Sequence, residues 1–241
     1  MRTFVTLFAL AWAPAALAFQ TITIDGTNDF TAEAELPAGG GGVWFVEHDA
    51  DKVYFGIFAK GLGSGSSTEF VWVYIDTNPG GATGSTLGVV YNTQEPVLPF
   101  EADFHFRWKA DNSYTNMLDY NDGSWTSDNL GADNFGIAAF QDGDYLEFSI
   151  PLASLGNPTT IRWVGAMINE QGGAESTYFQ TPDVNPGGYD SDFTSFHTRT
   201  VAASSTPVPA LPVWGLLAMA GMLGAAGAGA AGRRDEDDSA R

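Results

Sequence analysis

The sequence predicts an all-β protein, an antiparallel β-sandwich of the jelly-roll kind, with a secretory signal peptide before it and a membrane-spanning helix after it. Three observations lead to this prediction. Apolar and polar residues alternate with a period of two through the middle of the chain, turn-forming clusters separate the alternating runs, and an uncharged apolar run lies near each end. A period of two places successive side chains on opposite faces of a strand, which is typical of sheets with one covered face.

Residues 1–18 have the pattern of a signal peptide. Arg2 precedes a largely apolar run at 4–12, and Ala16 and Ala18 stand three residues and one residue before the expected cut. The run is too short to span a bilayer, so we expect cleavage after Ala18 and export of the remainder. The predicted sandwich domain is residues 19–203.

Two runs show the strand pattern most clearly. In 102–109 the even positions are apolar and the odd positions are charged or polar, which predicts a half-buried strand with His105 on the solvated face. In 145–150 the even positions are again apolar. Further strands are predicted at 20–24, 43–47, 53–59, 70–75, 87–91 and 161–168. Turn residues cluster between them, at 49–51, 61–67, 78–84, 121–123 and 141–144. The runs 43–47 and 53–59 form the clearest predicted hairpin.

Short motifs follow one another in a familiar order along this domain. Thr-Ile-Asp-Gly-Thr at 23–27 is followed by the hairpin at 44–59, by a strand ending Ile-Asp-Thr at 75–77, and by Glu-Phe-Ser-Ile-Pro at 147–151. This succession resembles the DOMON-like superfamily, to which the family-9 carbohydrate-binding modules belong. The resemblance implies a β-sandwich and, by analogy, a glycan ligand. Some DOMON domains bind haem through histidine and methionine; here Met117 and Met167 are candidates to pair with His105 or His197, although no local spacing marks such a pair.

Composition excludes one class of partner. The chain has 29 acidic and 10 basic side chains, a net charge of −19, and no cysteine. Nothing in such a chain replaces the counterions of a phosphate backbone, so we expect no nucleic-acid partner. The acidic side chains suit calcium, and they equally suit a surface kept soluble by its charge.

A repeated hexapeptide, Asp-x-Asn-Pro-Gly-Gly at 76–81 and 183–188, is the most specific internal signal. Proline and glycine specify a tight turn, and the aspartate and asparagine two positions apart can direct oxygens at one cation. The twelfth positions hold Leu87 and Thr194 instead of glutamate, so the repeat is not an EF-hand. The alternatives are turn chemistry alone or a looser calcium site with ligands among Asp76, Asn78, Asp183, Asn185 and Asp190.

Tryptophans provide the candidate glycan site. A sugar ring stacks its apolar C–H face on an exposed indole, while nearby carboxylates and amides bond its hydroxyls. Three tryptophans are candidates, namely Trp72, Trp108 and Trp125, with Asn121 and Asp122 as polar partners. Trp125 is favoured because it follows the turn at 121–123; the alternative, that these rings fill the core, is strongest for Trp108.

Enzyme motifs are absent from the sequence. There is no Gly-x-Ser-x-Gly elbow, no His-Glu-x-x-His and no phosphate-binding glycine loop, and the three histidines lie far apart. We therefore expect a non-catalytic protein. Two hypotheses stay open: a glycan-binding module, with or without calcium, and a structural cell-surface or biofilm-matrix protein with no small ligand.

The C-terminal 38 residues read as a sorting signal. A Ser/Pro linker and motif at 204–212 lead into an uncharged run at 213–232, long enough to span a bilayer as a helix, and a charged tail at 233–241 follows. The residues that define this pattern are Val208, Pro209, Leu211, Pro212, Trp214, Gly215, Arg233 and Arg234. They resemble the PEP-CTERM class, closest to its IPTL-CTERM variant. That resemblance implies a bacterial sorting protease or transpeptidase, a membrane-anchored precursor, and a mature protein at the cell surface or in the matrix; a plain membrane anchor is the alternative.

Overall fold

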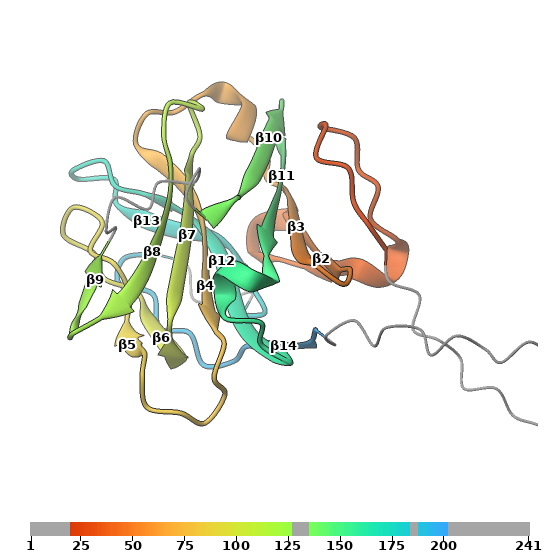
Figure 1. Ribbon diagram of the computed structural model, residues 1–241. Coiled ribbons are helices and arrows are strands. Elements are labelled where there is room, and N and C mark those ends of the chain that lie inside the picture. Colours follow the sequence, from red (N-terminus) through yellow and green to blue (C-terminus); the bar gives the residue numbers. More distant parts are fainter. Residues whose placement is uncertain (1–19, 127–134, 184–187, 202–241) are drawn as a thin grey trace, which may run out of the picture. The chain divides into compact units, whose positions relative to one another are not determined.

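The computed structural model describes residues 20–126, 135–183 and 188–201 of the 241 residues (Figure 1). The chain divides into two units, Met1–Ser204 and Ser205–Arg241, and every described residue belongs to the first. The predicted signal peptide and all predicted sorting residues lie outside the described ranges. Within those ranges no helix combines the length and the apolar character needed to cross a membrane.

Two antiparallel sheets form the body of the fold. The first, sheet A, has the order β1-β2-β3-β11-β10, with strands Glu35–Pro37, Val43–His48, Lys52–Phe58, Tyr145–Pro151 and Ala138–Asp142. The second, sheet B, has the order β13-β12-β4-β7-β8-β9, with strands Ser176–Thr181, Thr160–Asn169, Glu69–Asp76, Phe104–Lys109, Thr115–Asn121 and Ser124–Thr126; β14 (His197–Thr200) also pairs with β12. All of these strand pairs are antiparallel, which confirms the predicted all-β sandwich.

The remaining elements are short. Strands β5 (Ser85–Leu87) and β6 (Val97–Ala102) form a separate two-stranded sheet. The described helices are single 3-10 turns at Ala32–Ala34, Gly39–Gly41, Leu62–Ser64 and Leu152–Leu155. Their N-caps carry no side-chain hydrogen bond, so they are connectors and the sheets dominate the fold.

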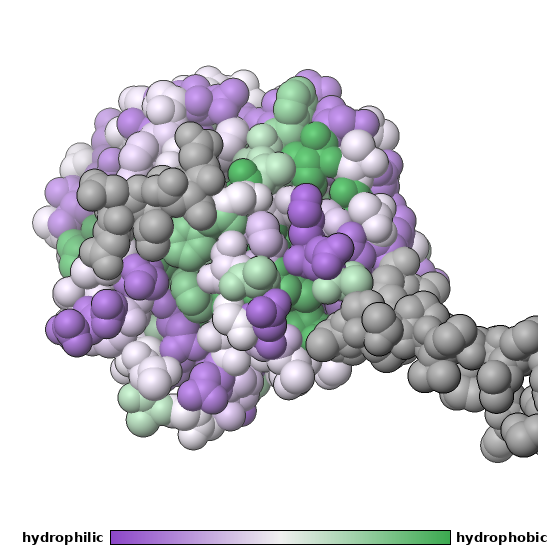
Figure 2. Space-filling view, viewed as in Figure 1, coloured by the Kyte–Doolittle hydropathy of each residue, from purple (hydrophilic) through white to green (hydrophobic). Residues whose placement is uncertain are grey.

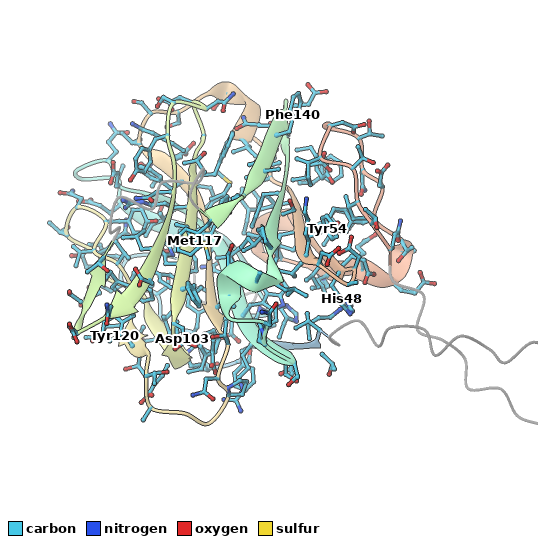
Figure 3. All side chains as sticks on the ribbon, viewed as in Figure 1. His48, Tyr54, Asp103, Met117, Tyr120 and Phe140 are labelled. Carbon is cyan, nitrogen blue, oxygen red and sulfur yellow. The ribbon has the colours of Figure 1, made fainter. Side chains whose placement is uncertain are left out.

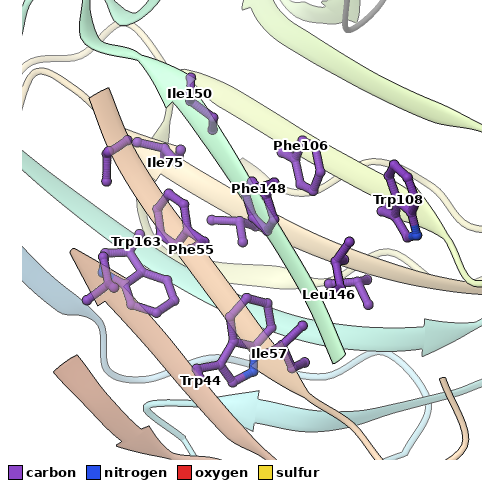
Figure 4. Close-up of a cluster of buried hydrophobic side chains, with 14 of the residues drawn as sticks. Trp44, Phe55, Ile57, Ile75, Phe106, Trp108, Leu146, Phe148, Ile150 and Trp163 are labelled. Atoms are coloured by element: carbon purple, nitrogen blue, oxygen red, sulfur yellow. The ribbon is translucent and has the colours of Figure 1, made fainter. Parts of the chain in front are cut away.

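The main core lies between the two sheets and combines aromatic rings with aliphatic side chains (Figure 4). Phe148 of sheet A stacks on Phe106 of sheet B at 3.9 Å between ring centroids and on Phe55 at 5.1 Å. Trp44 packs so closely on Gly165 that a Cβ there would lie 2.8 Å from the indole, which is why β12 carries glycine at this point. Each fully buried large side chain contributes about 1.5–3 kcal/mol to stability, so this layer provides most of the cohesion between the sheets.

The outer face of sheet B is also buried. Trp72 and Tyr74 of β4 point away from the inter-sheet core and pack with side chains of the 85–102 region and with Phe193. This second cluster contains eleven buried residues, of which Tyr91, Leu98, Phe100 and Ala102 come from the covering segment. Sheet B therefore has an apolar layer on both of its faces.

The outer face of sheet A is covered by the first described residues of the chain. Ile22 and Phe30 pack on Tyr54 and Tyr145 in a third, smaller cluster. The buried carboxylate of Glu147 on β11 accepts hydrogen bonds from the backbone N–H groups of residues 25 and 26, at 2.5 and 2.6 Å. We call residues 20–34 the N-terminal cover.

Several predicted elements are confirmed. The hairpin of β2 and β3 pairs residue 43 with 58 and residue 48 with 53, and β4, β11 and β12 contain the runs predicted at 70–75, 145–150 and 161–168. The predicted strand at 20–24 is wrong, because that segment pairs with no strand and lies in the N-terminal cover. Of 87–91 only Leu87 lies in a strand. Strands β1, β8, β9, β10, β13 and β14 are not predicted by the sequence, and neither is β6 apart from its last residue.

The strand predicted at 102–109 is confirmed from Phe104 onward as β7, but Ala102 is the last residue of a separate strand, β6. The chain leaves β6 at Ala102 and enters β7 at Phe104, and Asp103 fixes the change of direction because its N–H donates to the carbonyl of Ile75 at 2.9 Å. The predicted exposure of His105 is wrong: its exposed fraction is 0%. Alternation in sequence shows that two faces differ, but it does not show that a distant segment covers the second face.

Candidate functional site

The candidate site begins at the hairpin of β8 and β9. Asp122 and Gly123 join the two strands with φ of +50° and +82°, the pattern of a type I′ turn. The resulting register places Tyr120 opposite Trp125, with 5.3 Å between ring centroids. This turn therefore brings Trp125 to the end of sheet B where Tyr120 and Asp103 lie (Figure 3).

Trp125 is half-buried and held in one orientation. Its indole Nε1–H donates to the carbonyl of Leu87 at 3.0 Å. Its ring lies 5.5 Å from Tyr74 and 6.0 Å from His105, between centroids. The rest of its surface lines a small depression of about 150 Å³, together with Ser85, Leu87, Gly88, Glu95, Tyr120, Gly123 and Ser124.

A larger depression lies on the other side of Tyr120. Its volume is about 410 Å³. Its lining comes from the loop after β4, the junction of β6 and β7, strand β8, and the end of the 3-10 turn at Leu152–Leu155: Thr77, Thr83, Asp103, Phe104, Asp119, Tyr120, Asn121, Leu155 and Gly156. Because Tyr120 lines both depressions, they adjoin each other and form one candidate site.

The polar groups of the larger depression fall into two sets. The carboxylate of Asp103 is fixed: it accepts hydrogen bonds from the backbone N–H and hydroxyl of Thr77 at 2.8 and 2.9 Å and from the hydroxyl of Thr83 at 2.9 Å. Asp119 Oδ1 accepts a bond from Thr126 at 3.1 Å. By contrast, Asp119 Oδ2, the hydroxyl of Tyr120 and the side-chain amide of Asn121 make no hydrogen bond to another described residue. These groups are free to bind the hydroxyl groups of a ligand.

A rigid aromatic layer supports Trp125. His105 stacks on Tyr74 at 4.1 Å between ring centroids, and its Nε2 lies 2.8 Å from the hydroxyl of Tyr91. Burial holds the pKa of His105 well below its usual range, so the ring is neutral. The hydroxyl of Tyr74 accepts the N–H of Val89 at 2.6 Å, and burial raises its pKa. Because these rings are buried and pack against one another, the layer acts as a floor for the site.

The structure does not bring the histidine and methionine candidates for haem together. His105 faces the outer aromatic layer of sheet B, whereas Met117 is on the opposite face of the same two strands, in the inter-sheet core with Met167. His197 lies 4.7 Å from the ring of Trp163 and hydrogen-bonds Thr181 at 2.8 Å.

The prediction that Trp72 and Trp108 stack on a sugar is wrong, because both side chains are buried. Trp72 has an exposed fraction of 0% and fills the layer outside sheet B. Trp108 is 6% exposed, belongs to the inter-sheet core, and donates its Nε1–H to Gln141 at 2.7 Å. Neither ring offers a face to a sugar. Asn121 lines the larger depression, whereas Asp122 is exposed at the tip of the turn and lines neither one.

The aspartates among the predicted calcium ligands already accept hydrogen bonds from other groups of the protein. Asp76 accepts the N–H of Asn78 at 2.8 Å and faces Arg162 at 3.7 Å. Asp183 accepts two N–H bonds, from Thr194 at 2.6 Å and Ser195 at 2.9 Å, and Asp190 accepts the N–H of Glu95 at 2.8 Å. Asn185 lies outside the described residues. Among the residues that are described, no group of three or more histidine or acidic side chains could hold a metal ion. Calcium binding stays a prediction.

Sequence reasoning missed most of the depression. Tyr120 precedes the turn already singled out, so its position in the sequence could have identified it. Asp103, Asp119, Thr77 and Thr83 carry no such signal, since they come from strand β8, from the β6–β7 junction and from the loop after β4, which only the fold brings together. Comparison of the chain with protein-family models, with curated proteins and with solved structures finds no match. The function is therefore argued from the geometry of this site.

Proposed function

We propose that the protein is a non-catalytic glycan-binding module that binds sugar at the end of sheet B. The observation that carries the proposal is the pairing of a half-buried, anchored Trp125 with an adjoining depression of about 410 Å³ lined by carboxylate, amide and hydroxyl groups. A sugar needs an apolar surface for its C–H face and convergent polar groups for its hydroxyls. Trp125 supplies the first, and Asp119, Tyr120 and Asn121 supply the second.

The setting of this module is part of the same proposal. The signal peptide at 1–18, the apolar run at 213–232 and the motif around Trp214 support export to the bacterial surface, followed by removal of the tail by a sorting enzyme. The motif order between residues 23 and 151 supports a DOMON-like, jelly-roll arrangement of the sandwich. Calcium dependence is a separate proposal, and it rests on the repeated Asp-x-Asn-Pro-Gly-Gly turn.

A glycan array with the full-length protein tests the proposal, run with and without EDTA. We expect binding that Trp125→Ala reduces at least tenfold, because stacking is lost. The matched control is Phe140→Ala, which removes an aromatic ring that is 46% exposed on sheet A, far from Tyr120 (Figure 3). Equal loss in both variants, or no loss in the Trp125 variant, would place the binding elsewhere. Binding that EDTA leaves unchanged would remove calcium from the proposal.

The alternative is a structural surface or matrix protein without a small ligand. It is favoured by the net charge of −19. The face seen in Figure 2 mixes hydrophilic, neutral and hydrophobic residues. Such a protein would bind no glycan on the array, and Trp125→Ala would then change only its stability.

A further inference from the structure

We infer that the site selects sugars that carry a free amine over acidic and neutral sugars; this rests on the proposed function and specifies its ligand class. Three of the residues that line the two depressions carry carboxylates: Asp103 and Asp119 in the larger one and Glu95 in the smaller one. The described lining contains no lysine and no arginine. Arg162, on neighbouring β12, faces Asp76 and lines neither depression.

These charges act where solvent screens them only in part. Asp103 and Asp119 are half-buried, in a hollow with Phe104 and Leu155 in its wall. Opposite charges at the edge of an apolar wall attract more strongly than in bulk water, and like charges repel by the same rule. A uronic or sulphated sugar would therefore bring a negative charge against carboxylates with no basic partner in the described lining.

Asp119 is the residue that would receive the amine. Its Oδ1 is already bonded to Thr126, while its Oδ2 has no partner among the described residues. Asp103, in the same depression, accepts hydrogen bonds from Thr77 and Thr83. These donors are uncharged, so they hold the carboxylate in place without neutralising it. Because Tyr120 separates this hollow from Trp125, we infer that one sugar ring stacks on Trp125 and the next places its amine beside Asp119.

The test uses three oligosaccharides that differ in charge: a glucosamine oligomer, its fully N-acetylated counterpart of the same length, and a uronic-acid oligomer. Titration into the full-length protein, followed by tryptophan fluorescence and by calorimetry, gives each Kd. We expect the glucosamine oligomer to bind about five- to tenfold more tightly than the acetylated one, and the uronic oligomer to bind most weakly.

Two manipulations isolate the charge. Asp119→Asn keeps the shape and removes the carboxylate nearest to the amine, so the preference for the glucosamine oligomer over its acetylated counterpart should fall toward one. Glu33→Gln, which removes an exposed charge on the N-terminal cover, should leave this preference unchanged. Raising the pH until the sugar amine is neutral should also bring the preference of the wild-type protein to about one. This second route needs no variant and stands even if Asp119→Asn does not fold.

The outcomes separate the inference from the proposed function. If the acetylated oligomer binds as tightly as the amine form, or the uronic oligomer binds best, the inference fails and glycan binding stands. If none of the three binds and the array is also negative, the proposed function fails, and the inference with it.

Discussion

The two outer faces of the sandwich are both covered, and the covers differ in chemistry. Over sheet B the cover is an apolar cluster of eleven buried residues centred on Trp72 and Tyr74. Over sheet A it is the N-terminal cover, whose apolar cluster has six buried residues and which is held at its tip by the carboxylate of Glu147. One cover is a second core, and the other is a segment attached by a few apolar contacts and polar bonds.

This difference explains where the candidate site lies. A stacking ring must stay in place while its exposed side meets the ligand, and the aromatic layer over sheet B gives Trp125 such support. A segment attached by fewer buried contacts opens at lower free-energy cost and is a poorer floor. We therefore expect the sheet B cover to be the most stable part of the domain outside the inter-sheet core.

The strongest test of this comparison is Trp72→Ala. Removing a fully buried indole from the sheet B cover should lower the free energy of unfolding by about 3–5 kcal/mol, measured by urea denaturation. Trp72→Phe is the matched control, since Trp72 Nε1 has no hydrogen-bond partner and phenylalanine keeps most of the apolar volume. A cost for alanine below about 1 kcal/mol would mean that the sheet B cover is not a second core.

A smaller effect is expected in the N-terminal cover from Glu147→Leu. This change leaves the N–H groups of Asp25 and Gly26 and the hydroxyl of Tyr145 without their acceptor, at a cost of about 2–3 kcal/mol. Glu147→Gln keeps an acceptor oxygen and should cost less than about 1 kcal/mol. Hydrogen exchange should show faster opening of residues 20–34 in the leucine variant. Equal stability of the two variants would show that the carboxylate does not hold the cover.

The same comparison shows what the sequence can and cannot predict. The strands β2, β3, β4, β11 and β12 are readable because their apolar runs are long and regular. Strand β8 is not, since Thr115–Asn121 mixes polar and apolar side chains. Burial of Glu147 and His105 could not be predicted either. The partners of Glu147 are Asp25 and Gly26, which lie 122 and 121 positions before it in the sequence. Periodicity carries no information about such distant partners. Trp125 could be predicted because the turn that positions it lies just before it in the sequence. Asp103 and Asp119 are separated in the sequence and come to one depression only in the folded protein.

Titration of His197 gives a smaller, pH-dependent test at the edge between the sheets. Burial lowers the pKa of His197 from 6.5 to about 4. Because the folded protein favours the neutral ring, His197 contributes stability above pH 6.5 that is lost as the pH falls toward 4. After allowance for partial exposure, this loss should be about 1–2 kcal/mol. The urea midpoint of the wild-type protein should fall between pH 6.5 and pH 4, and the midpoint of His197→Gln should fall less over the same range. If the two midpoints fall in parallel, His197 is not the group that causes the loss of stability.

The smallest expected effect concerns the turn that carries the site. Gly123 has φ of +82°, and a Cβ added there would meet nothing within 4 Å. Gly123→Ala should therefore cost about 1 kcal/mol through backbone strain alone. Gly172→Ala is the matched control, because its φ is not positive and its added Cβ would lie 3.9 Å from the nearest atom, so its stability should stay within about 0.5 kcal/mol of wild type.

Glycan binding by Gly123→Ala and Gly172→Ala tests whether the turn or the sheet B cover sets the position of Trp125. Trp125 is held from below by Tyr74 and His105 and from the side by Leu87, so a strained turn should shift Asn121 and Tyr120 more than the indole. Glycan affinity should then fall by a few fold in Gly123→Ala while the fluorescence of Trp125 changes little. A large fluorescence change would show that the turn, and not the aromatic layer, sets the position of the stacking ring.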